Sequence, residues 1–299
     1  MATNIIFLGT SCMVPTAERN HQGVFLEHQG SGILFDCGEG IQRQMKLAKI
    51  RPTQINKIVI SHWHGDHVLG LPGLLQTMSS SDYTGKLQIY GPKGSIKYFE
   101  HMFKAFVFDS KLDMEITEFE KDGEFVSNND YSIEAYKLEH KVLTYGFRFI
   151  EKDRLRVNLT YTKSLGIPEG PLLGKLQNGK NIVFNGKKIE YEKATRLVPG
   201  KIIGIISDTV ICNNCYKIAD NADLLISEAT YTHDLKDKAD LYQHLTAQET
   251  AQIASQSNAS KLIVTHLSQR YKTDEEIRAE VTTFFEDSDV AYDLMKVKV

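Results

Sequence analysis

The stretch Ser61-His62-Trp63-His64-Gly65-Asp66-His67 decides the fold. It follows the β-branched run Ile58-Val59-Ile60, which predicts a buried strand over residues 57–61, and a glycine-rich helix start follows at residues 70–73. Alternate side chains after a strand end can point to one spot, so His62 and His64 can converge on one ion while Asp66 and His67 turn toward a second position. Imidazole and carboxylate groups suit zinc, manganese or iron. The stretch therefore predicts a metal site at the end of a strand.

Short apolar runs alternate with helical spacing on both sides of this motif. Strands are expected at residues 5–8, 24–27, 33–36, 57–61, 87–90, 202–206, 224–227 and 262–265, and helices at 40–50, 69–78, 95–106, 213–219, 247–256 and 274–285. A meander is expected over 115–119, 131–138 and 145–149, and a last strand over 290–297. Buried strands alternating with helices predict an α/β fold with two sheets between outer helices, an αββα sandwich.

Residues 151–180 break this pattern. The segment is rich in glycine, proline and basic residues, with six Lys or Arg against three Asp or Glu. A long irregular segment in a compact domain is usually functional or mobile. We therefore expect an insertion within a single domain over residues 1–299, not a domain boundary.

Composition limits the kinds of protein this can be. The chain has 299 residues and a formal net charge of −3, so any nucleic-acid contact must come from a local basic patch. Four cysteines are too few for a disulfide scaffold and favour a reducing compartment. The N-terminus does not resemble a signal peptide, and no apolar run approaches the ~18 residues of a membrane helix. We expect a cytoplasmic protein that does not associate with membranes.

The H-x-H-x-D-H pattern of residues 62–67 resembles the hallmark of the metallo-β-lactamase superfamily, and the resemblance predicts three further ligands, each at the end of a strand. His140 follows residues 131–139, Asp208 follows residues 204–207, and His266 follows residues 261–265. A lone histidine at a strand end is more often structural than a ligand. Three such residues, in this order behind the histidine motif, favour ligation.

The same resemblance assigns these side chains to two metal positions. The resemblance implies His62, His64 and His140 on one metal, Asp66, His67 and His266 on the other, and Asp208 bridging both. The resemblance also implies a bridged pair of Zn²⁺ ions, with Mn²⁺ or Fe²⁺ as substitutes. Such a pair activates a shared water for phosphoryl displacement. Asp66 is a candidate acceptor of that water's proton.

Other stretches resemble ribonuclease Z, the family that trims the 3′ end of precursor tRNA. They are residues 9–20 (GTSCMVPTAERN), 35–42 (FDCGEGIQ), 70–75 (GLPGLL), 165–172 with 174–176 (LGIPEGPL and GKL), 227–230 (SEAT) and 244–246 (HLT). The resemblance spans the chain from Gly9 to His266. It implies that residues 151–180 form a protruding basic arm, and that His244, oriented by Glu228, is a proton donor.

The implied activity is hydrolysis after the discriminator nucleotide of precursor tRNA, leaving a tRNA 3′ hydroxyl. The resemblance to the short form of the family implies a homodimer. It also implies that basic side chains of the arm bind phosphates, with Arg154, Arg156, Lys163 and Lys175 as candidates. An ordinary solvated basic loop is the plainer interpretation of this segment, and a helix-cap histidine is the plainer interpretation of His244.

Two other functions fit parts of the sequence. A small-molecule phosphodiesterase or other hydrolase of the same fold would keep the metals but have little use for a basic arm. A non-catalytic RNA-binding homologue would be expected to lose ligands that are all present here. The pair Cys212 and Cys215 is a lone C-x-x-C, which is weak support for zinc or redox chemistry and favours structural cysteines.

Overall fold

The computed structural model describes residues 3–81, 83–107 and 110–299. Met1 and Ala2 lie outside these ranges; they begin the N-terminal stretch that is not expected to be a signal peptide. The chain divides into two compact units. The first contains Met1–Ser127, Ile133–Phe149 and Ile202–Val299, and the second contains Asn128–Ser132 and Ile150–Lys201.

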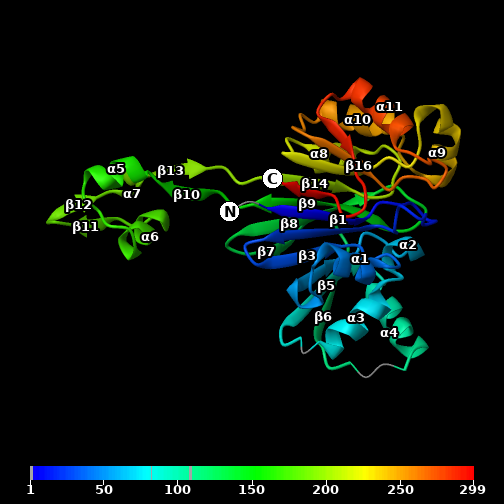
Figure 1. Cartoon of the computed structure of the whole chain (residues 1–299), viewed down its shortest axis with the longest axis horizontal. Helices are drawn as coiled ribbons and strands as arrows, with labels where there is room; N and C mark the ends of the chain where they lie inside the picture. The colour runs from blue at the N-terminus through cyan, green and yellow to red at the C-terminus, as the bar shows by residue number, and fades with distance from the viewer. Residues whose placement is uncertain (1–2, 82, 108–109) are drawn as a thin grey trace. The chain divides into compact units, whose positions relative to one another are not determined.

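Among the described residues, the first unit is built on two seven-stranded sheets (Figure 1). The strands of the first sheet, in spatial order, are β18 (Lys296–Lys298), β1 (Asn4–Gly9), β2 (Gly23–His28), β3 (Ser31–Phe35), β4 (Ile55–Val59), β5 (Lys86–Pro92) and β6 (Asp113–Phe119). Those of the second sheet are β17 (Ser288–Val290), β16 (Leu262–Thr265), β15 (Leu224–Glu228), β14 (Ile202–Ile206), β9 (Thr144–Glu151), β8 (Tyr131–Leu138) and β7 (Gly123–Ser127).

Aromatic side chains pack the two sheets against each other. The ring of Phe35 on β3 lies 5.6 Å from that of Phe147 on β9, and Phe119 on β6 lies 4.7 Å from Tyr145 on β9, both measured between centroids. Phe35, Phe147 and Tyr145 are almost completely buried. Burial of this aromatic surface stabilises the folded state and determines which face of each sheet packs against the other sheet.

Helices cover the outer face of each sheet (Figure 1). Those beside the first sheet are α1 (Ile41–Ala48), α3 (Leu71–Ser80) and α4 (Ser95–Ala105), and those beside the second are α8 (Asn213–Ala219), α10 (Ala247–Gln256) and α11 (Glu275–Phe284). The shorter helical segments are α2 (Gly65–Val68), α9 (Lys236–Tyr242), η1 (Pro52–Gln54) and η2 (His233–Leu235). The predicted αββα layering is confirmed.

The second unit has regular structure where an irregular segment was expected. Its elements are β10 (Arg154–Val157), α5 (Leu159–Ser164), α6 (Pro171–Gln177), β11 (Ile182–Phe184), β12 (Lys187–Ile189), α7 (Tyr191–Ala194) and β13 (Thr195–Val198). The Asn158 side chain accepts the Tyr161 N–H at 3.1 Å and caps α5, and Pro171 begins α6. Ile167, Leu176 and Ile189 are among the residues of a small core. The expectation of an irregular stretch is wrong because short capped elements leave little periodic signal.

Two strand assignments also need correction. Residues 115–119 do not join a meander, because β6 pairs in parallel with β5 in the first sheet, and β7 takes the place beside β8. The expected strand over 290–297 is two short strands in different sheets: β17 pairs with β16, and β18 pairs with β1. Asp293 fixes the crossing between them, since its carboxylate accepts hydrogen bonds from the Thr10 hydroxyl, the Asn20 N–H and the Gln44 amide.

Candidate metal centre

Every expected metal ligand lies near the end of a strand or in the turn that follows it, in the first unit. His62 and His64 follow β4, and the short helix α2 carries Asp66 and His67. His140 follows β8, Asp208 follows β14, and His266 follows β16. The structure brings together all seven side chains that the sequence singled out.

Three histidines and one aspartate form the first cluster. His62 Nε2 lies 3.1 Å from His64 Nδ1, and His140 Nε2 lies 3.3 Å from the same His64 nitrogen. Asp208 Oδ2 is 3.7 Å from His62 Nε2 and 3.9 Å from His140 Nε2. One ligand atom from each residue therefore faces a single point, the arrangement that a bound metal ion requires.

Two histidines and the same Asp208 form the second cluster, with Asp66 beside it. His67 Nε2 and His266 Nε2 are 3.2 Å apart. Asp208 Oδ2 lies 3.6 Å from His67 Nε2, and Asp208 Oδ1 lies 3.4 Å from His266 Nε2. Asp66 Oδ2 is 3.4 Å from His266 Nε2. Asp208 is thus the residue shared by both clusters, as a bridging carboxylate would be.

Hydrogen bonds hold the outward-facing ring nitrogens of His67 and His140. His67 Nδ1 lies 2.7 Å from Asp36 Oδ2, and His140 Nδ1 lies 2.9 Å from the Gln243 carbonyl oxygen. Since a carboxylate and a carbonyl only accept, both Nδ1 atoms donate and both rings direct Nε2 inward. Such outer contacts orient metal-binding imidazoles.

Asp36 is a site residue that the sequence reasoning missed. Its carboxylate also accepts the Ser61 N–H and the Ser61 hydroxyl, each at 2.8 Å, so it joins the β3 end to the histidine motif. The sequence feature that could have identified Asp36 is its position at a strand end, directly before Cys37-Gly38. Gly38 packs so closely that a Cβ there would meet the Asp66 carbonyl oxygen at 2.3 Å, which explains the glycine.

Charge in the centre is balanced between carboxylates and imidazoles. Burial lowers the pKa of His62 well below its usual value, which keeps the ring in its neutral, ligating form. Burial opposes ionisation of Asp208, but His266 and His67 hold the pKa of its carboxyl well below the usual range. Burial likewise opposes a charge on His67, yet Asp208, Asp36 and Asp66 raise the pKa of that ring well above normal.

The donor set fits divalent metal ions. Asp208 Oδ1 is buried without a hydrogen-bond partner among the described residues, and closely spaced ring nitrogens face the same space. The negative charge of Asp66 and Asp208 must be compensated there by protons on the histidines or by a cation. A cation satisfies the orphaned oxygen and the ring nitrogens together.

His244 and Glu228 lie beside the two clusters. His244 Nδ1 is 3.1 Å from Glu228 Oε1 and 3.2 Å from Oε2, and it is 3.9 Å from Asp208 Oδ2. Burial opposes a charge on His244, but the Glu228 carboxylate outweighs it and raises the pKa of the imidazole. The Thr209 N–H and the Thr230 hydroxyl donate to Glu228 at 2.8 and 2.7 Å, which fixes its position.

The four candidate RNA-binding residues lie in the second unit. Arg154 and Arg156 are on β10, Lys163 on α5 and Lys175 on α6, and all four are exposed. Arg156 stands directly opposite Arg196 in the antiparallel pair of β10 and β13. This unit carries eleven Lys or Arg against six Asp or Glu, a balance of +5 in a chain whose net charge is −3.

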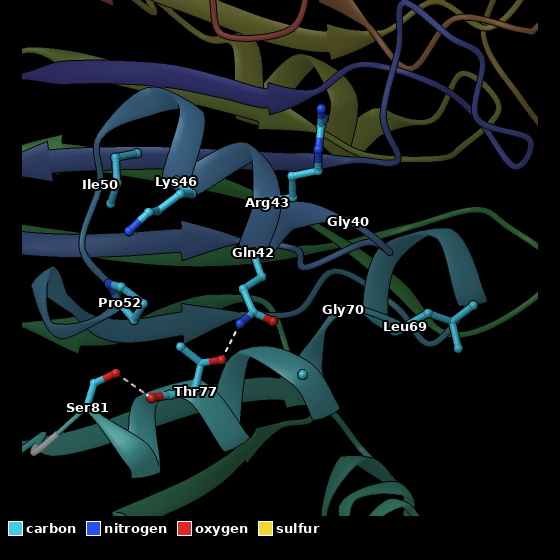
Figure 2. A pocket seen from close by; sticks show the side chains of 11 residues that line it. Gly40, Gln42, Arg43, Lys46, Ile50, Pro52, Leu69, Gly70, Thr77 and Ser81 are labelled. Carbon is cyan, nitrogen blue, oxygen red and sulfur yellow. Dashed lines mark hydrogen bonds between the residues drawn. The ribbon is translucent and has the colours of Figure 1, made fainter.

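A separate surface hollow of about 710 Å³ lies between α1 and α3 (Figure 2). Arg43 and Lys46 of α1 line one side, and Gln42 donates a hydrogen bond to Thr77 of α3. None of the metal-capable side chains lines this hollow, so it is not part of the candidate centre. In the three described ranges, no helix is both long enough and apolar enough to cross a bilayer.

Comparisons with known proteins identify the family of the chain. A family model described as anti-Pycsar protein Apyc1 matches residues 3–162. The chain is 38% identical over 298 residues to ribonuclease Z of an Exiguobacterium species, covering 98% of each chain. It is also 38% identical to ribonuclease Z of Archaeoglobus fulgidus, over all of this chain and 98% of that protein.

Solved structures give the same result. The crystal structure of human tRNase Z, short form, aligns with a TM-score of 0.73 at 26% identity and covers 98% of both chains. The metallo-β-lactamase fold protein YhfI of Bacillus subtilis aligns with the same TM-score at 18% identity, over 100% of this chain and 99% of that one, which supports the fold alone. The chain belongs to the ribonuclease Z family of metallo-β-lactamase-fold hydrolases, and its residues 3–162 also belong to the family described by Apyc1.

Proposed function

We propose that this protein is a metal-dependent endoribonuclease that removes the 3′ trailer from precursor tRNA. The observation that carries the proposal is the convergence of seven metal-capable side chains on two adjoining points, with the His244–Glu228 pair beside them. The ribonuclease Z relatives match over nearly the whole chain, which supports the same activity for this protein.

The residues would hold two metal ions. His62, His64 and His140 would bind one ion, Asp66, His67 and His266 the other, and Asp208 both. Zn²⁺ suits these nitrogen and oxygen donors best, with Mn²⁺ or Fe²⁺ as alternatives. When bound, such a pair lowers the pKa of a shared water and stabilises charge on phosphoryl oxygens.

Side chains of the protein would move the protons. Asp66 would accept the proton of the attacking water, and the Met13 N–H, which donates to its Oδ2 at 2.8 Å, supports the position of the carboxylate. As the bond between phosphorus and the ribose 3′ oxygen breaks, His244 donates a proton to that oxygen. The products are a tRNA 3′ hydroxyl and a trailer with a 5′ phosphate.

The second unit would bind the RNA. The exposed Arg154, Arg156, Lys163 and Lys175 provide charge for phosphate contacts, and Arg196 adds a guanidinium opposite Arg156. We also propose a homodimer in which the second unit, as the protruding arm of one subunit, holds RNA for the other. Its mass in solution, measured by light scattering, tests this part. The cytoplasm, where precursor tRNA would be met, is the proposed location.

Cleavage of a 3′-extended precursor tRNA tests the function. Purified protein should make one cut after the discriminator nucleotide, and a chelator or His64→Ala should abolish it. Intact tRNA, together with metal-dependent hydrolysis of bis-p-nitrophenyl phosphate, would replace the proposal with a small-molecule phosphodiesterase.

A further inference from the structure

Cys12 lies in a loop that is fixed onto the candidate metal centre. The loop follows β1, and the Cys12 N–H donates to the carbonyl oxygen of Leu267 at 3.0 Å. The Leu267 N–H returns a bond to the Thr10 carbonyl at 2.9 Å, so the loop runs alongside the turn that carries His266. The next residue, Met13, donates its N–H to Asp66 Oδ2 at 2.8 Å. These bonds hold the cysteine in place between two expected ligands.

The Cys12 thiol lies close to two of the residues expected at the second metal position, Asp66 and His266. One ligand atom each from Cys12, Asp66 and His266 lies within 4.8 Å of the others. Ligands bound at about 2.0–2.3 Å from a zinc ion are at most about 4.6 Å apart, so an adjustment of a few tenths of an ångström places all three around one ion.

A second, independent observation points to a cation at the same place. Asp208 is 3% exposed, its Oδ1 has no hydrogen-bond partner among the residues described, and this oxygen lies 3.4 Å from His266 Nε2. His266 Nδ1 already contacts the Thr230 hydroxyl at 3.1 Å, which leaves Nε2 for the centre. His266 is therefore shared by the group that contains the unpartnered Asp208 oxygen and by the group that contains the Cys12 thiol.

We propose that Cys12 is an additional ligand of the metal position formed by Asp66, His67 and His266. Its sulfur gives that position a mixed nitrogen, oxygen and sulfur donor set, while among the residues that the structure describes the position formed by His62, His64 and His140 has no sulfur donor. A thiolate prefers zinc to manganese, so the two positions differ in metal preference. This inference rests on the proposed metal centre, but it does not depend on RNA being the substrate.

The absorption spectrum of the cobalt-loaded protein tests the ligand directly. A thiolate bound to Co²⁺ gives a near-ultraviolet charge-transfer band that nitrogen and oxygen ligands do not give. The wild-type protein with two cobalt ions bound should show the band, Cys12→Ser should lose it, and Cys212→Ser, which removes a half-buried thiol outside the metal clusters, should keep it. A fully loaded wild-type protein without the band overturns the proposal, as does a band that survives in Cys12→Ser.

Metal competition provides a second readout. Cys12→Ser should lower the affinity of one of the two zinc ions at least about tenfold, the scale known for changes even outside the ligand shell, and should reduce the preference for zinc over manganese. An unchanged preference contradicts the proposal. If Cys12→Ser does not fold, the wild-type cobalt spectrum still decides. Cleavage of precursor tRNA without the charge-transfer band would reject the ligand and leave the proposed function in place.

Discussion

Glu228 Oε1 lies 3.1 Å from His244 Nδ1, although the two residues come from a strand end and from a loop between two helices. The carboxylate also accepts the N–H of Thr209, the residue after Asp208, so a single side chain connects the proposed proton donor to the neighbour of the proposed bridging ligand. The His244 ring is thereby oriented toward the metal clusters, and its ring centroid is 5.3 Å from that of His140.

Removing the proposed proton donor should slow cleavage without loss of metal. We expect His244→Ala to lower the single-turnover rate by about 10²–10⁴-fold, the usual contribution of general acid catalysis, and Glu228→Gln to lower it less. Glutamine still accepts the Thr209 N–H through its amide oxygen, so the loop should keep its position. Metal content and tRNA affinity are measured on the same samples. A normal rate in His244→Ala would exclude the proton-donor role, and partial recovery with added imidazole would support it.

Asp36 should control metal affinity. Its carboxylate orients His67, and loss of such an outer contact typically costs about 10–100-fold in metal affinity. We expect Asp36→Ala to lose metal to a chelator at correspondingly lower concentrations, as followed by a competing zinc dye. Asp113→Ala, which removes an exposed carboxylate on β6, is the matched control and should bind metal normally. Equal metal affinity in both variants would exclude an orienting role for Asp36.

The convergence of the candidate ligands could be predicted because they stand just after apolar strand residues or in the turn that follows a strand. Asp208 follows Ile202–Ile206, and His266 follows Leu262–Thr265. The proximity of Asp36 to His67 and of Cys12 to His266 could not be predicted, since the residues of these pairs are 31 and 254 positions apart in the chain. β17 and β18 have three residues each, too few for a periodic signal, and their pairing depends on which sheet edge is free.

Thr246, part of the His-x-Thr element, should matter for stability. Its hydroxyl accepts the Glu249 N–H at 3.2 Å, and the Glu249 carboxylate accepts the Thr246 N–H at 2.9 Å, a reciprocal cap at the start of α10. We expect Thr246→Ala to lower the free energy of unfolding by about 1 kcal/mol, within the 0.5–2 kcal/mol range for such caps, and Thr246→Ser to restore most of it. Urea denaturation of the three proteins measures the difference. A destabilised serine variant would mean that the threonine methyl group, not the cap, is important.

Cys212 should react with alkylating agents at unusually low pH. Its Sγ lies 3.6 Å from Cys215 Sγ, and the hydrogen bond from Cys215 lowers the pKa of the Cys212 thiol from 9.0 to about 6, although burial opposes the charge. Because the pKa is depressed, the thiolate is present above pH 6 and disappears as the pH falls through that value. The iodoacetamide rate, followed by mass spectrometry, should rise around pH 6 and then level off. Cys215→Ser removes the sulfur donor, and an unchanged profile in that variant would assign the low pKa to the surrounding backbone.

Arg156 provides the sharpest test of the RNA contact because it stands opposite Arg196 on a two-stranded ribbon. Like charges directly opposite each other are destabilising, so Arg156→Ala should leave the free energy of unfolding unchanged or slightly higher. Loss of one phosphate contact should nevertheless weaken precursor tRNA binding similarly for all sequences and reduce the slope of log affinity against log salt by about 1. Fluorescence anisotropy over a salt series measures both quantities. Arg51→Ala removes an exposed arginine from the first unit and should leave the slope unchanged. If the two variants bind tRNA alike, Arg156 makes no phosphate contact, and the paired arginines are an ordinary solvated surface.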